Sequence, residues 1–87
     1  TAGFEVLGGL LSLFCHAVEA GAGHERMTTR ERMLLKLLPT QFLAHDGQPD
    51  ANPYIRLLQV ADFVAGMTDS YAVDLFRKLK GIDLPSD

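Results

Sequence analysis

Apolar or small side chains recur every three or four positions from residue 57 to residue 79, a spacing that lines up one face of a helix. The series comprises Leu57, Ala61, Val64, Thr68, Ala72, Leu75 and Leu79. Asn52 and Pro53 precede it as a typical helix start, with asparagine as the N-cap and proline at the first helical position. The spacing predicts one long helix from Pro53 to Lys80, with a bend near Gly66 as the alternative.

This predicted helix carries the candidate site residues of the chain. Asp62 and Asp69 are seven positions apart, so one continuous helix would place both carboxylates on nearly the same side, with Gly66 between them. Arg56 precedes the apolar run, and Tyr71 falls on its inward half. A carboxylate held on a rigid helix accepts hydrogen bonds from a ligand or from a neighbouring arginine. The four residues are therefore candidates for ligand contacts, or for interface and capping contacts without a ligand.

Two further helices are expected upstream. The first runs from Phe4 to Glu19 and has a wide apolar stripe, and its other side is lined by small residues: Gly8, Gly9, Ser12 and Cys15. Because each interior glycine costs about 1 kcal/mol relative to alanine, we expect a neighbouring helix to approach closely there. The second helix begins at Thr28, whose spacing to Glu31 is that of a capping box, and it ends before Pro39.

The rest of the chain is punctuated by turns. Residues 40–43 can add one further turn, and residues 44–52 have the composition of a loop. The fold class expected from these segments is all-α: a compact bundle of about three helices with a long C-terminal helix. At 1.5 Å per residue the last helix would be about 42 Å long, more than a domain of this size covers. We therefore expect the chain to be a fragment of a larger helical protein.

Composition narrows the class of protein. The 87 residues carry a net charge of −3, which gives no electrostatic reason to expect nucleic-acid binding. Cys15 is the single cysteine, which excludes an internal disulfide and favours a reducing compartment such as the cytoplasm. The longest stretch without Asp, Glu, Lys or Arg, residues 6–18, is too short for a membrane span, so no membrane partner is expected.

No self-contained catalytic or metal site is evident. The pair His45 and Asp46 lies in the predicted loop without a third ligand nearby, and His24 is isolated. Cys15 and His16 are adjacent on a predicted helix, so their side chains diverge by about 100° and cannot share a ligand. No catalytic residue and no metal ligand is therefore assigned. A basic cluster is read as a solvated helix face, or alternatively as a contact for a triphosphate or an acidic partner; it comprises Arg26, Arg30, Arg32 and Lys36.

The most specific motif lies within the predicted long helix. Residues 62–72 read Asp-Phe-Val-Ala-Gly-Met-Thr-Asp-Ser-Tyr-Ala, followed by Leu-Phe-Arg-Lys-Leu at 75–79 and Gly81-Ile82. Residues 2–11 read Ala-Gly-Phe-Glu-Val-Leu-Gly-Gly-Leu-Leu. These segments resemble the C-terminal region of bacterial deoxyguanosinetriphosphate triphosphohydrolases and related dNTP triphosphohydrolases of the HD superfamily. The resemblance covers essentially the whole chain.

The resemblance implies that residues 1–87 form a C-terminal helical domain of a metal-dependent hydrolase that converts a dNTP, often dGTP, to deoxynucleoside and triphosphate. The family's metal ligands, a His, a His-Asp pair and a further Asp, have no counterpart here, so the divalent metal is expected in a catalytic HD domain absent from this chain. The fragment alone is then expected to be inactive and to serve packing, homo-oligomer assembly or peripheral nucleotide contacts through Arg56, Asp62, Asp69 and Tyr71. The alternative is a non-catalytic oligomerisation or nucleotide-effector-binding module.

Overall fold

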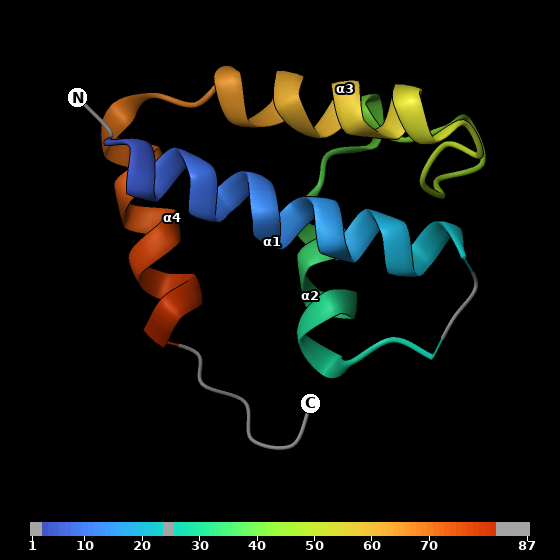
Figure 1. Ribbon diagram of the computed structural model, residues 1–87, viewed down its shortest axis with the longest axis horizontal. Coiled ribbons are helices and arrows are strands. Elements are labelled where there is room, and N and C mark those ends of the chain that lie inside the picture. Colours follow the sequence, from blue (N-terminus) through green and yellow to red (C-terminus); the bar gives the residue numbers. More distant parts are fainter. Residues whose placement is uncertain (1–2, 24–25, 82–87) are drawn as a thin grey trace.

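The computed structural model describes residues 3–23 and 26–81, and within them all regular structure is helical. The elements are α1 (Phe4–Ala22), α2 (Thr29–Leu37), the short 3₁₀ helix η1 (Thr40–Phe42), α3 (Pro53–Ala65) and α4 (Asp69–Gly81) (Figure 1). The predicted all-α class is confirmed. Predictions that involve His24 and Ile82 concern positions outside the described residues.

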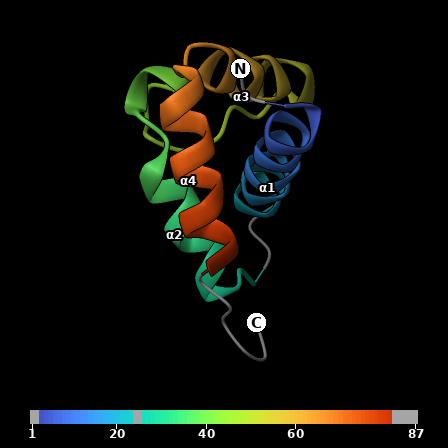
Figure 2. The same ribbon diagram turned by 90° about the vertical axis from the view of Figure 1, so that its left-hand side faces the viewer.

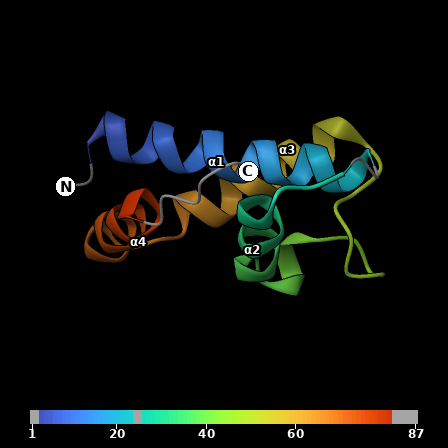
Figure 3. The same ribbon diagram turned by 90° about the horizontal axis from the view of Figure 1, so that it is seen from below.

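The helix α1 is the centre of the arrangement, because α2, α3 and α4 all contact it. α3 runs back alongside α1 in the opposite direction, whereas α2 and α4 cross α1 steeply (Figures 1 and 3). Seen from the side, α2 and α4 overlap in projection and α3 lies across one end of them (Figure 2), whereas Figures 1 and 3 show α2 and α4 at separate places along α1. With 19 residues, α1 is long and apolar enough to cross a membrane, judged by length and composition alone. Four of its residues, Leu10, Phe14, Ala17 and Val18, belong to the hydrophobic core.

The single long helix predicted from Pro53 to Lys80 is wrong, because α3 ends at Ala65 and α4 begins at Asp69. Gly66 caps α3, its N–H donating to the carbonyl of Asp62 over 3.1 Å. Thr68 then starts α4: its Oγ1 accepts from the Tyr71 N–H at 3.2 Å, and its carbonyl accepts from the Ala72 N–H at 2.9 Å. The turn allows α4 to fold against α1, where a continuous helix would have projected past it.

The expected close approach at the small side of α1 is found at one of the two glycines. A Cβ atom at Gly9 would clash with Cε1 of Phe76 on α4, whereas nothing lies within 4 Å of one at Gly8. α1 also continues beyond the predicted end at Glu19, to Ala22, and Gly21 is one of its buried residues. A Cβ there would lie 2.8 Å from Cδ1 of Leu35 on α2. Gly9 and Gly21 thus mark where α4 and α2 meet α1.

The hydrophobic core joins all four α-helices. Its buried members are Leu10, Phe14, Ala17, Val18, Leu34, Leu38, Val60, Val64, Ala72 and Leu79. Three aromatic rings connect neighbouring elements: Phe63 of α3 lies edge-on to Phe14 of α1, with ring centroids 5.2 Å apart, and 5.4 Å from the ring of Phe42 in η1. These contacts hold α3 and the segment after α2 on the same side of α1.

The predicted helix starts at Thr28 and Asn52 are confirmed. Thr28 Oγ1 accepts from the Glu31 N–H at 3.0 Å, and a Glu31 carboxylate oxygen accepts from the Thr28 N–H at 2.9 Å, which completes the capping box. The side-chain oxygen of Asn52 accepts from the Tyr54 N–H at 2.9 Å. Residues 44–52 form the expected loop, and η1 is the additional turn after Pro39.

Candidate functional site

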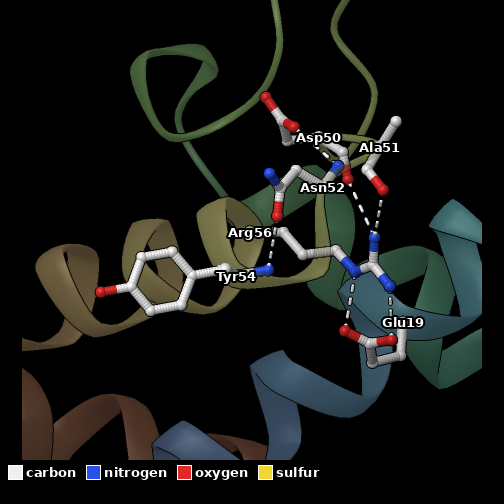
Figure 4. Close-up of polar contacts among 6 residues, drawn as sticks. All are labelled: Glu19, Asp50, Ala51, Asn52, Tyr54 and Arg56. Atoms are coloured by element: carbon white, nitrogen blue, oxygen red, sulfur yellow. Dashed lines mark hydrogen bonds and ion pairs between the residues drawn. The ribbon is translucent and has the colours of Figure 1, made fainter.

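Arg56 lies in the first turns of α3 and fastens the start of that helix to the end of α1 (Figure 4). Its Nε and Nη2 donate to the two carboxylate oxygens of Glu19, each over 2.7 Å. Its Nη1 donates to the backbone carbonyls of Asp50 and Ala51, each over 3.1 Å. All three guanidinium nitrogens are therefore engaged within the chain, and only 12% of the side chain is exposed. This predicted ligand contact is a structural clamp in this arrangement.

The clamp also alters the acid–base properties of its members. Hydrogen bonds from Arg56 are the main cause that holds the pKa of the Glu19 carboxyl below its ordinary value; burial opposes them, and the positive charge of Arg56 adds a smaller lowering effect. The same hydrogen bonds raise the pKa of Arg56. Burial and then the negative charge of Glu19 raise the pKa of the nearby Cys15 thiol. Cys15 is accordingly a poor nucleophile at neutral pH.

The other three predicted residues do not join Arg56 in one site. Asp62 is exposed on α3, whereas Asp69 begins α4, so the turn at residues 66–68 separates the carboxylates that a continuous helix would have aligned. Tyr71 was predicted to face inward, but 53% of it is exposed because α4 turns a different side towards α1.

Asp69 and Tyr71 share one open depression along α4, with a volume of about 920 Å³. Arg77 and Asp74 line its far end, and Asp74 forms an exposed ion pair with Lys78, 3.0 Å between Oδ2 and Nζ. Asp69 lies in the first turn of α4, where a negative charge complements the helix dipole. The depression therefore offers charges of both signs but no enclosed pocket.

A second depression, of about 480 Å³, lies where the turn between α3 and α4 faces η1. Tyr71 contributes to it as well, together with the rings of Phe42 and Phe63 and the Met67 side chain. Our sequence reasoning did not identify Phe42 or Phe63 as part of any site. The non-helical residues 43–52 separate them, so no single helix relates the two rings and only the tertiary packing brings them together.

The titratable residues give no metal centre in the part of the chain that is described. No group of three or more His, Cys, Asp or Glu side chains is close enough there to hold a metal ion. His45 and Asp46 are exposed in the loop, where a carboxylate oxygen of Asp46 accepts from the Gln48 N–H at 2.9 Å. This bond gives Asp46 a local role in the turn.

The basic cluster is partly committed to local contacts. Arg32 donates to the carbonyl of Met27 over 2.7 Å and to the hydroxyl of Thr29 over 3.3 Å. Arg30 donates to the carbonyl of Leu79 over 3.4 Å and so links α2 to α4. The two arginines thus point to different partners and do not converge on one anion.

A match to a known domain family identifies the kind of domain that these helices form. The phosphohydrolase-associated domain matches residues 10–78, a stretch that begins in α1 and ends in α4. This chain belongs to the phosphohydrolase-associated domain family. The shared unit includes α2 and α3 in full and most of α1 and α4, and it contains both the turn at residues 66–68 and the Arg56 clamp.

Curated relatives of this phosphohydrolase-associated domain are all described as deoxyguanosinetriphosphate triphosphohydrolase-like proteins. The protein from Listeria monocytogenes is 38% identical over 93% of the chain and 19% of the relative. The Synechocystis protein is 42% identical over 95% of the chain and 17% of the relative. The Pseudomonas aeruginosa protein is 40% identical over 88% of the chain and 16% of the relative. The resemblance to deoxyguanosinetriphosphate triphosphohydrolase-like proteins is thereby confirmed, whereas the C-terminal placement and the HD superfamily stay predictions.

These matches cover only a small part of each curated relative. The chain spans less than a fifth of the length of these curated relatives. No solved structure matches the chain.

Proposed function

We propose that this chain is the C-terminal helical domain of a dNTP triphosphohydrolase, with dGTP as the first substrate to test, and that the whole enzyme releases deoxynucleoside and triphosphate. The observation that carries the proposal is 38–42% identity, over nearly the whole chain, to proteins described as deoxyguanosinetriphosphate triphosphohydrolase-like. The match to the phosphohydrolase-associated domain over residues 10–78 supports it independently.

Catalysis is assigned to another part of the longer polypeptide. The described residues provide no ligand set for a metal ion, so the divalent metal implied by the family does not fit that part of the chain. A catalytic HD domain preceding this domain would hold it. By itself the chain is proposed to be inactive.

The role proposed for this domain is packing, assembly or peripheral contact with nucleotide. Asp69 and Tyr71 are the side chains suited to such contacts, because both line the open depression along α4. Asp62 is exposed on α3 and suits an interface. Arg56 supports the domain from within through Glu19. The whole enzyme is proposed to be a cytoplasmic homo-oligomer.

The test is an assay of the full-length purified protein with each of the four dNTPs and a divalent metal ion, in which released triphosphate and deoxynucleoside are quantified. Metal-dependent release of both products from at least one dNTP is expected, with dGTP assayed first. Absence of release from all four would refute the enzymatic proposal. The 87-residue chain serves as the control and is expected to release neither product.

A non-catalytic oligomerisation module is the second candidate, because α3 presents an exposed apolar face that an assembly could cover. Sedimentation of the full-length protein with and without dNTP separates the two. Nucleotide-dependent assembly without any hydrolysis would favour the module, and hydrolysis would reject it as the primary function.

A further inference from the structure

The helix α3 is apolar on almost every side, which is unusual for a helix at the surface. Its buried side carries Val60 and Val64, which face the core. Beyond the N-terminal Pro53, its exposed residues are Tyr54, Ile55, Leu57, Leu58, Asp62 and Ala65. We call these six positions the outer α3 face. At 100° per residue they span about 160° of the helix circumference, and Asp62 is their only charge. A helix that is apolar all round is normally buried.

The exposure of this face is substantial. Tyr54 is 67% exposed, Leu57 52%, Leu58 43% and Ile55 36%. These four are more than half of the large apolar side chains exposed among the described residues, the others being Phe4, Leu37 and Tyr71. In two perpendicular views no other described element lies beyond α3 on its outer side (Figures 1 and 2). Such a concentration of apolar surface marks an interaction site.

We propose that the outer α3 face is the surface on which this domain docks against the remainder of its own polypeptide. The identity of that remainder as the catalytic part rests on the function proposed above. More than four-fifths of each curated relative lies outside the aligned region, so a large body of protein is available on the same chain. Covalent linkage gives that body a high effective concentration at the face.

The size of the face argues against a second copy of the domain as its occupant. The outer α3 face consists of six residues on one side of a 13-residue helix. A stable protein–protein interface engages about 20–30 residues of each partner. A tethered surface can bind through the smaller area because it does not lose the translational freedom of a separate molecule.

The single charge on the face indicates the chemistry of the opposing surface. Asp62 lies beside Leu58 on the helix, one turn further on, so a partner that covers the leucine also approaches the carboxylate. The complementary surface should therefore be apolar and carry one arginine or lysine opposite Asp62.

The experiment measures solvent access to this face in the full-length protein. Native cysteines, including Cys15, are replaced by alanine, and a single cysteine is introduced as Leu58→Cys. Lys78→Cys is the matched control, because Lys78 is an exposed residue of α4. The rate of maleimide modification under native conditions is divided by the rate in unfolding urea. We expect this ratio to be at least about a hundredfold lower for Leu58→Cys than for Lys78→Cys, because labelling must await opening of the interface.

Equal ratios at the two positions would overturn the proposal. If Leu58→Cys disturbs folding, as judged by circular dichroism, Tyr54→Cys replaces it and decides the matter by the same criterion. Protection that disappears on dilution, together with dissociation seen by sedimentation, would also overturn it, since a second copy would then be the occupant. Protection of Leu58→Cys without triphosphate release would refute only the proposed activity. Triphosphate release without protection of Leu58→Cys would refute only the docking surface.

Discussion

Gly8 and Gly9 are adjacent on α1, yet a methyl group at each would meet different surroundings. At Gly8 the space is open, and at Gly9 the Phe76 ring occupies it. Gly8→Ala should therefore raise the free energy of unfolding by about 0.5–1 kcal/mol through helix propensity. Gly9→Ala has the same propensity gain but must displace the ring, so we expect it to be about 1–3 kcal/mol less stable than Gly8→Ala. Urea denaturation followed by circular dichroism measures the difference.

Equal stabilisation by both glycine substitutions would show that Phe76 moves aside without cost. A double variant that also carries Phe76→Leu is the matched check, because the smaller side chain should remove most of the penalty at Gly9. The same substitution should leave the effect of Gly8→Ala unchanged, since nothing lies within 4 Å of a Cβ there.

The Glu19–Arg56 pair makes stability depend on pH in a definite direction. The pKa of Glu19 is lower in the folded chain than its ordinary value of 4.5, so the unfolded state binds a proton more readily. The stabilisation from the Glu19–Arg56 pair is complete above about pH 4.5, the ordinary pKa of Glu19, and is lost as the pH falls through the folded-state pKa. Unfolding midpoints measured from pH 6 to pH 2.5 should therefore fall less steeply for Glu19→Gln than for the unmodified protein. Parallel curves would contradict the assignment.

At the scale of the elements, Thr68 distinguishes two helices from one. Within a continuous helix Thr68→Ala would stabilise, because alanine is the better helix former. Thr68 is instead the N-cap of α4, where its hydroxyl accepts from the Tyr71 N–H. We therefore expect Thr68→Ala to lower the free energy of unfolding by about 1 kcal/mol. Ser70→Ala, two residues further on, is the control and should change it by less than about 0.5 kcal/mol. If Thr68→Ala instead raised the free energy of unfolding, the result would favour a single continuous helix over two.

At the scale of the whole molecule, Phe63 joins three elements through its ring. Its contacts with Phe14 and Phe42 connect α3 to α1 and to η1. We expect Phe63→Ala to lower the free energy of unfolding by about 3 kcal/mol, the lower end of the range for phenylalanine because the ring is half-buried. Tyr54→Ala, at an exposed position of the same helix, is the control for thermal denaturation of the isolated chain. Similar losses for both would show that the aromatic cluster does not hold the bundle together.

The sequence by itself determined the local features of this protein. The capping box of Thr28 and Glu31 and the Asn52–Pro53 start depend on groups within three positions of one another. Helical class follows from the spacing of apolar residues, and the motif at 62–72 was sufficient to indicate the family. The apolar spacing nevertheless continued through residues 66–68, because a three-residue turn between two caps preserves the phase of the pattern.

Tertiary structure decided what joins distant positions. Glu19 and Arg56 are 37 positions apart, and no periodicity relates them. Gly8 and Gly9 are chemically identical, and only the placement of Phe76 distinguishes them. The exposed side of α3 is as apolar as its buried side, so its pattern could not reveal which side lies against α1. These features depend on which surfaces meet after folding, and that is settled by packing around α1.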